Sequence, residues 1–540
     1  MNTRRERRSL TDLQTDYDNG NKKQLEDLMR AWKGIKELPA SHPHSFFVLG
    51  GYHGEPFRGA GFGNSDFWGG YCQHGNVLFP IWHRIYLYKL EEALRSIPGC
   101  AEVTLPFWDE CSADSLANGI PRALTDERFE LDGETIDNPL RSYTFPLNVN
   151  DHISGDEPNY SKAAGYKTVR YPYSGLVGTP DDRAATTAHN ATWTYPQAVE
   201  VLNENVVAWL NQEIVVDDTP VNPIGIHQAF ADCLNAPNYT VFSNTTSATA
   251  WNDNEPSVVP LESPHNKMHL AVGGSDVPGK EEASIITGAN GDMGENDTAG
   301  LDPIFYFHHC FVDRVFWLWQ QRHGATDNLE IIDKYPGTNS VDHQGPTPGI
   351  PSNAWLSMDT PLEPFTLKEN GNRRYYTGRD AFDIEGQLGY TYGAGWLGVG
   401  PVADPAGASP APSASASGHE LKIHVSGINR GNISGSFIIT AFAKLGGKRM
   451  PIGSEAVLSR WHVEGCANCQ THLLAAASFP LTRIGPLTSI GPLTSIDAEY
   501  LRAYEIDVEV RTHQGLLGGR PHGLTALPGE AGPHFRVEVR

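Results

Sequence analysis

Seven histidines have the neighbours and the spacing of metal ligands. They are His53, His74 and His83 in the first part of the chain, and His265, His269, His308 and His309 further on. If the segment PHNKMH is helical, His265 and His269 project from one face, one turn apart. His308 and His309 lie in an apolar segment, where burying a ring without a partner costs on the order of 1–3 kcal/mol. Metal coordination removes that cost, so the pattern predicts a metal centre.

The type of ligand narrows the choice of metal. Imidazole suits zinc, copper, iron and nickel, so the rings alone do not decide. A catalytic zinc site keeps three protein ligands and one open position. A di-iron site needs several Glu or Asp ligands at ExxH spacing, and no carboxylate separates His265 from His269. Two three-histidine sites that face each other fit copper best, because a copper pair can pass two electrons to O2 together.

Helical and strand patterns divide the chain into two unlike parts. The segments 82–95 and 304–321 have the apolar residues of helices, which would carry His83 and the His308–His309 pair. Residues 401–418, PVADPAGASPAPSASASG, contain almost nothing that can be buried and predict a flexible linker. We expect a core domain over 1–400 and a small β-sandwich-like domain over 419–540. The apolar runs at strand length in the second domain are 421–425, 436–443, 504–510 and 535–539.

Composition excludes several classes of partner. A formal charge of -23 over 540 residues argues against binding nucleic acid or an anionic membrane. No segment approaches the roughly 20 apolar residues needed to span a bilayer. The basic cluster Arg4, Arg5, Arg7 and Arg8 precedes no apolar region, so we expect a solvated tail and not a secretory signal. Seven cysteines, an odd number, also favour an intracellular setting. A homo-oligomer is compatible with these features.

Two long segments resemble the copper-binding signatures of the tyrosinase family. Residues 74–91, HGNVLFPIWHRIYLYKLE, are similar to the copper-A signature. Residues 302–313, DPIFYFHHCFVD, are similar to the copper-B signature of tyrosinases, catechol oxidases and hemocyanins. LPFWDE at 105–110 and the Tyr390–Tyr392 motif extend the resemblance. It implies a mainly α core, a four-helix bundle with long loops that binds two copper ions. It also implies oxidation of phenols or catechols to o-quinones with O2.

The resemblance assigns ligands by motif position. It implies that His53, His74 and His83 hold copper A, and that His265, His269 and His309 hold copper B. His308 is then left beside the metal or the substrate. Cys72 stands two residues before His74, where many relatives form a thioether to the copper-A histidine. The alternative for Cys72 is a small buried apolar side chain.

Three more polar residues match positions with roles in the family. Glu262 and Asn266 match a pair that holds a water proposed to deprotonate the incoming phenol. A phenol has a pKa near 10, so it must lose its proton before it binds copper at neutral pH. The alternative for Glu262 is a solvated loop carboxylate, and the alternative for Asn266 is a polar residue at the start of a helix. Asn296 falls at a gating position over copper A, where many relatives carry Val or Phe.

The tail resembles the C-terminal domain of long fungal tyrosinases. Cys466 and Cys469 form a CxxC motif that is linked to copper loading in those proteins, and soft thiolates select Cu(I). A redox pair or half of a zinc site are the alternatives. In that family the domain covers the active site and keeps the enzyme latent. The resemblance predicts activation within 401–418 and a plug of the copper pocket near Val457–Leu458.

Two related functions stay open at this point. A catechol oxidase or o-aminophenol oxidase would share the site but lack phenol hydroxylation. A hemocyanin-like O2 carrier would use the same six histidines and bar phenols from the metals.

Overall fold

The computed structural model describes most of the 540 residues. The described ranges are 4–54, 70–150, 161–176, 180–216, 219–280, 290–342, 349–397, 422–445, 448–459, 474–481, 505–513, 515–519 and 535–539. The expected linker 401–418 and both cysteines of the CxxC motif, Cys466 and Cys469, lie outside these residues. Within them, no helix is both long and apolar enough to cross a membrane.

The core is helical, as expected, and the helices predicted around His83 and His308–His309 are confirmed. They are α4 (Phe79–Arg95) and α12 (Ile304–His323), which pack on each other. Helix α2 (Lys23–Glu37) also packs on α4, and α11 (Glu262–Gly273) carries His265 and His269. Pro80 lies in the first turn of α4, where its missing N–H costs nothing. Helix α12 ends at Gly324, whose left-handed conformation (φ 62°) favours glycine.

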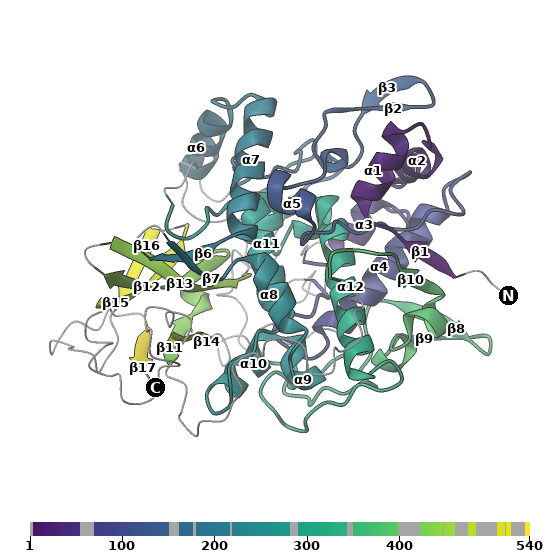
Figure 1. Ribbon diagram of the computed structural model, residues 1–540. Coiled ribbons are helices and arrows are strands. Elements are labelled where there is room, and N and C mark those ends of the chain that lie inside the picture. Colours follow the sequence, from purple (N-terminus) through teal and green to yellow (C-terminus); the bar gives the residue numbers. More distant parts are fainter. Residues whose placement is uncertain are drawn as a thin grey trace.

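Further helices and hairpins surround these four helices (Figure 1). The helices are α1 (Leu10–Asp18), α3 (Phe46–Gly51), α5 (Ala113–Asn118), α6 (Pro180–Asn190), α7 (Tyr195–Leu210), α8 (Ile226–Cys233), α9 (Tyr239–Ser243) and α10 (Thr245–Asn252). The paired strands are β2 (Arg128–Leu131) with β3 (Glu134–Asp137), β4 (Val149–Asn150) with β5 (Ser161–Lys162), β6 (Glu213–Val216) with β7 (Thr219–Pro223), and β8 (Thr366–Glu369) with β9 (Asn372–Tyr375).

The N-terminal segment is part of the folded core, which corrects the expectation of a solvated tail. Strand β1 (Arg5–Arg7) pairs in parallel with β10 (Tyr390–Tyr392). Arg7 is fully buried and donates to Glu91 (Nε to Oε2, 2.8 Å). The expectation was wrong because the carboxylates that neutralise Arg7 lie far away in sequence. Burial without such a partner would cost several kcal/mol.

The C-terminal part forms two antiparallel sheets, as expected. One sheet has the order β14 (Leu474–Pro480), β11 (Lys422–Asn429), β17 (Arg536–Val539). The other has the order β13 (Lys448–Val457), β12 (Phe437–Leu445), β15 (Glu505–Thr512), β16 (Gly515–Gly519). One hydrophobic cluster takes residues from both sheets. The four expected strands correspond to β11, β12, β15 and β17, whereas β13, β14 and β16 were not predicted.

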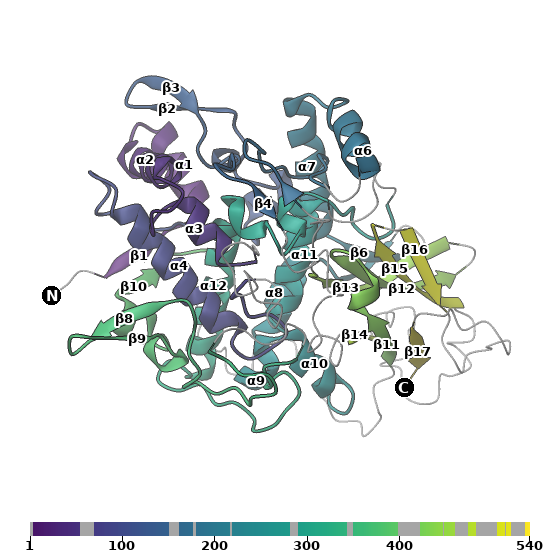
Figure 2. The same ribbon diagram turned by 180° about the vertical axis from the view of Figure 1, so that it is seen from behind.

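The two parts meet along α10 and α11. Lys422 in β11 donates to the backbone carbonyls of Asn252 and Glu255, the second at 2.7 Å. Strand β13 packs against α11. Figures 1 and 2 place α8 and α11 between the sheets and helices α4 and α12. One face of α11 therefore borders the C-terminal part.

Candidate metal centre

Two groups of buried side chains are arranged like metal ligands. One group is His265, His269, His308 and His309, and the other is His53, Cys72 and His74. Within each group, one possible ligand atom per residue lies within 4.8 Å of all the others. Helices α11 and α12 supply the first group. The second comes from the segment that follows α3 and the segment that precedes α4.

Three imidazoles of the first group converge on one point. The Nε2 atom of His309 lies 3.1 Å from Nε2 of His265 and 3.2 Å from Nε2 of His269. Burial and the neighbouring rings lower the pKa of His265 and His309 well below the usual value. The rings are therefore neutral at physiological pH, which is the form that binds metal.

Outward hydrogen bonds fix the direction of four rings. In each of them Nδ1 donates to an oxygen, which leaves Nε2 available to a metal. Metal-binding histidines are commonly oriented by a hydrogen bond of this kind. The pairs are His83 with the Phe79 carbonyl (2.8 Å), His265 with the Asn266 side chain (2.8 Å), His269 with the Met293 carbonyl (2.7 Å) and His308 with the Glu110 carboxylate (2.6 Å).

His83 lies between the two groups. Its ring centroid is 5.1 Å from that of His74 and 5.5 Å from that of His53, and it stacks on His309 at 4.5 Å. Its Nε2 atom is buried and has no hydrogen-bond partner among the described residues. An imidazole nitrogen buried in this way fits a metal ion as its missing partner. The donor set, made almost wholly of neutral imidazoles, suits copper.

Cys72 and Asn296 lie on the His53–His74 side. Cys72 is buried, and its Sγ is 3.9 Å from Nδ2 of Asn296. The Asn296 side chain is itself buried, and its Oδ1 has no hydrogen-bond partner among the described residues. The structure thus places Asn296 beside the expected copper A, and Cys72 beside His74.

Glu262 holds several backbone segments together. Its Oε1 accepts from the Gly75 N–H (2.7 Å), next to His74. Its Oε2 accepts from the Thr245 N–H (2.9 Å) and hydroxyl (3.1 Å). Burial raises the pKa of Glu262, and these hydrogen bonds oppose the rise. Glu262 therefore links α11 to the loop that carries His74, a role that its sequence position did not predict.

Asn266 connects the histidines to the C-terminal part. Its Oδ1 accepts from His265, while its Nδ2 donates to the backbone carbonyl of Ala456 in β13 (3.1 Å). A cavity of about 30 Å³ is bordered on one side by His74, Glu262 and Asn266. Arg430, residues 455–458 and residues 475–476 close the other side. Sequence reasoning could not find the Ala456 contact, because a backbone carbonyl leaves no signal in residue type.

Glu110 is a second residue that sequence reasoning missed. It is buried in the segment LPFWDE, and among the residues that the structure describes its carboxylate hydrogen-bonds only to His308. The His308 ring stacks on that of His265, with centroids 5.2 Å apart. A carboxylate inside an otherwise apolar segment was the available signal, because such a group needs a buried partner.

Known proteins are similar to this chain in sequence and in fold. The family profile for the common central domain of tyrosinase matches residues 43–322. The chain is 54% identical over 497 residues to "Tyrosinase HcTyr2" of Hahella sp. (strain CCB-MM4), with 88% of each chain covered. It is 46% identical over 512 residues to a tyrosinase of Aspergillus oryzae, with 89% of each covered. The solved structure of tyrosinase from Burkholderia thailandensis at low pH matches with a TM-score of 0.80 at 50% identity, over 94% of each chain.

Proposed function

This chain belongs to the tyrosinase family, and from that premise we propose how its residues carry out the oxidation of phenols. The protein is a copper oxidoreductase of the tyrosinase type. The observation that carries the detailed proposal is the convergence of His265, His269 and His309 beside a second histidine group. When bound, a copper pair would transfer the electrons of the phenol or catechol to O2, so that the substrate leaves as the o-quinone and O2 is reduced to water.

The histidines divide between two ions in this proposal. His53, His74 and His83 would hold copper A, and His265, His269 and His309 would hold copper B. The close approach of the three Nε2 atoms supports the copper-B set. For copper A, the support is the ring positions of His53 and His74 and the buried, unpaired Nε2 of His83. A thioether between Cys72 and His74 would further fix the His74 ring.

Proton handling falls to Glu262 and Asn266 in this proposal. A phenol must lose its proton to bind metal at neutral pH. Burial raises the pKa of Glu262, which makes its carboxylate a stronger base than an exposed Glu side chain. Both side chains border the small cavity next to His74. Asn296 would contact substrate on the copper-A side, where its Oδ1 is buried and has no hydrogen-bond partner among the described residues.

A variant of Glu262 tests this role against a structural one. In Glu262→Gln, the amide cannot accept hydrogen bonds at both ends, so some loss of stability is expected. If Glu262 also handles the phenol proton, hydroxylation of tyrosine falls by about 100-fold or more, while oxidation of a catechol falls much less. Equal losses with both substrates would assign Glu262 a structural role only.

The same assay, with tyrosine and with a catechol, also separates a tyrosinase from a catechol or o-aminophenol oxidase and from a hemocyanin-like O2 carrier. An enzyme with phenol hydroxylase activity oxidises tyrosine after a lag and oxidises a catechol at once. A catechol oxidase or o-aminophenol oxidase oxidises only the second substrate, and a hemocyanin-like carrier oxidises neither. The tyrosinase names of the relatives favour the first outcome.

We also propose that the C-terminal part, 419–540, keeps the core, 1–400, latent, with activation within 401–418. Leu458 supports this idea, because it is buried and belongs to the hydrophobic cluster of the core. Ala456 supports it too, through its hydrogen bond with Asn266. Val457–Leu458 would be the plug, and Cys466 and Cys469 would assist copper loading.

Two chains test the latency. A chain that ends at residue 400 should oxidise catechol faster than the full chain, at equal copper content. The full chain carrying Leu458→Ala should gain part of that activity. If neither chain turns over catechol faster than the unchanged protein, the C-terminal part does not restrict access.

A further inference from the structure

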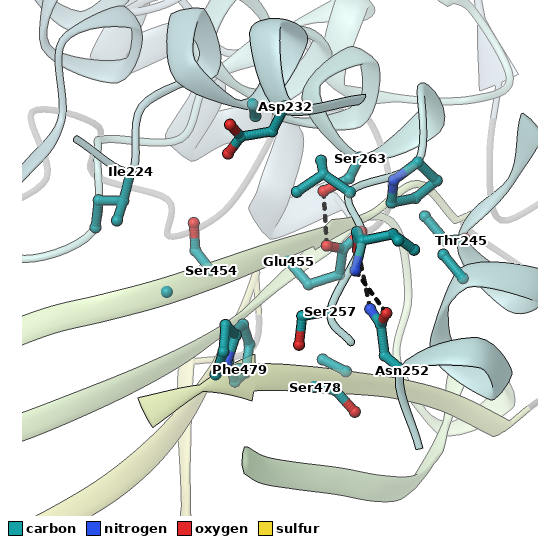
Figure 3. A pocket seen from close by; sticks show the side chains of 18 of the residues that line it. Ile224, Asp232, Thr245, Asn252, Ser257, Ser263, Ser454, Glu455, Ser478 and Phe479 are labelled. Carbon is teal, nitrogen blue, oxygen red and sulfur yellow. Dashed lines mark hydrogen bonds between the residues drawn. The ribbon is translucent and has the colours of Figure 1, made fainter. Parts of the chain in front are cut away.

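The last turn of helix α11 rests on the loop 290–298. The N–H of Gly291 donates to the carbonyl of Gly273, the last residue of α11. The two segments lie very close together, because a Cβ on Gly273 would be only 1.9 Å from a backbone nitrogen of the loop. The first turn of α11 has a different support, since Ser263 donates to Glu455 of β13 (2.8 Å), as Figure 3 shows. The loop therefore supports the end of α11 that lies within the core.

The same loop contacts both groups of histidines. The carbonyl of Met293 accepts from Nδ1 of His269 (2.7 Å), which sets the direction of that ring. Three residues later, Nδ2 of Asn296 lies 3.9 Å from Sγ of Cys72. A hydrogen bond to a fixed acceptor commonly orients a metal-binding histidine and raises its affinity for the metal. A displacement of this loop would therefore move the group that orients His269.

A buried lysine holds the loop from the side of β5. The Nζ atom of Lys162 lies 2.7 Å from Oδ1 of Asp292 and 3.3 Å from Oε2 of Glu295. All three side chains are shielded from solvent. Burial alone would lower the pKa of Lys162, but the two carboxylates outweigh it and raise the pKa, so the ammonium stays charged. Lys162 thus binds two residues of the loop, one on each side of Met293.

The carboxylate of Asp292 has two further donors. Its Oδ2 accepts from the hydroxyl of Tyr166 and from the N–H of Val169, each at 2.7 Å. The N–H of Asp292 in turn donates to the carbonyl of Val169 (3.0 Å). A buried carboxylate is stable only with partners of this kind. Asp292 is therefore the point at which the loop is joined to the segment 162–169.

We propose that Lys162 is a positioning residue for copper B, because it fixes, through Asp292 and Glu295, the loop whose Met293 carbonyl orients His269. This inference rests on the proposed role of His269 as a ligand. Without the ammonium, two buried carboxylates would repel each other and lack a counterion, so the loop would shift to hydrate them. The His269 ring would then lose its acceptor.

The copper affinity of a chain that holds one ion tests the inference without oxidase activity. The His83→Ala background should keep only copper B, so competition with a chelator measures that site alone. Adding Lys162→Met should lower the affinity by about 10- to 100-fold. It should also change the electron paramagnetic resonance spectrum of the Cu(II) ion, which reports the arrangement of its ligands.

Lys36→Met is the matched control, since it also replaces a lysine enclosed by the core. Lys36 in α2 donates to the carbonyls of Pro139 and Ser142, the second at 2.6 Å, and no hydrogen bond joins it to the loop among the described residues. Lys36→Met should leave the affinity and the spectrum unchanged.

A variant of the carboxylate provides a second test. Asp292→Asn keeps the size of the side chain and removes its charge, so it should weaken copper binding in the same direction. In the double variant with Lys162→Met the two losses should not add, because both changes break one contact. If Lys162→Met does not fold, Asp292→Asn alone carries the test.

Three results would overturn the inference. They are an affinity and a spectrum that the Lys162 and Asp292 variants leave unchanged, an equal loss in Lys36→Met, and losses that add in the double variant. Each of them leaves the ligand assignment intact, because the background still binds one ion. If the His83→Ala background binds two ions or none, the ligand assignment itself fails, and the inference fails with it.

Discussion

Arg84 in α4 and Asp313 in α12 form a buried ion pair, with 2.6 Å between Nε and Oδ1. The second carboxylate oxygen of Asp313 accepts from the hydroxyls of Tyr390 (2.7 Å) and Tyr392 (2.6 Å). The two helices that carry His83 and His309 are thus held in register by charge and not only by apolar packing. This explains why Arg and Asp appear in motifs otherwise defined by histidine.

Removing the Asp313 charge should destabilise the core. Asp313→Asn leaves Arg84 without its carboxylate in a buried site, which costs about 3–5 kcal/mol of unfolding free energy. Denaturant unfolding measures the change. Asp359→Asn, which breaks an exposed pair with Arg379, is the matched control and should leave the midpoint unchanged. Similar midpoints for both variants would mean that the buried pair contributes nothing net.

Acid should weaken the same network. Burial raises the pKa of Asp313 and of Glu91, but Arg84, Arg7 and Arg95 outweigh it, so both values lie below the usual range. Their stabilising contribution is present above pH about 4 and is lost as pH falls through the lowered values. The free energy of unfolding should decline from pH 5 to 3, and less steeply in Asp313→Asn. Parallel declines would show that other groups govern acid unfolding.

Each histidine group should account for one copper ion. His83→Ala and His309→Ala should each lower the copper content from two ions per chain to about one and abolish catechol oxidation. Metal analysis after reconstitution measures the content. His323→Ala, at the exposed end of α12, should keep both ions. Retention of two ions by His83→Ala and His309→Ala would refute the ligand assignment.

Gly54 should be sensitive to a single added methyl group. A Cβ at this position would lie 1.8 Å from the backbone oxygen of Asn296, so Gly54→Ala must displace His53 or the Asn296 loop. We expect lower occupancy of copper A with copper B retained. Loss of half of the copper, measured with the folded content checked by circular dichroism, would agree with this. Full occupancy of both sites would show that the loop moves freely.

The helical core was predictable from the sequence because its signals are local. Apolar periodicity located α4 and α12, and the PHNKMH spacing placed His265 and His269 on one helix face, as the structure shows. The strands β13 and β14 were not predicted. The first has Pro and Gly in its interior and pairs across a bulge, and the second is mostly small residues, so neither alternates clearly.

The remaining differences concern contacts between distant residues. Arg7 looked like part of a solvated tail because its carboxylate partner is Glu91, 84 positions later. Glu110 lies in the LPFWDE motif, but the sequence assigns it no role, because its partner His308 is 198 positions away. Composition and spacing do not report such pairs, which exist only once the chain has folded.

The pairing of β1 with β10 also sets an order on synthesis. Residues 5–7 are synthesised almost four hundred residues before their partners 390–392. Closing so long a loop is slow. Arg7 becomes buried only when β1 has paired with β10. The pairing can therefore form only after residues 390–392 have been synthesised, which leaves a long interval during which the Arg7 cation is unburied and the edge of β1 is open.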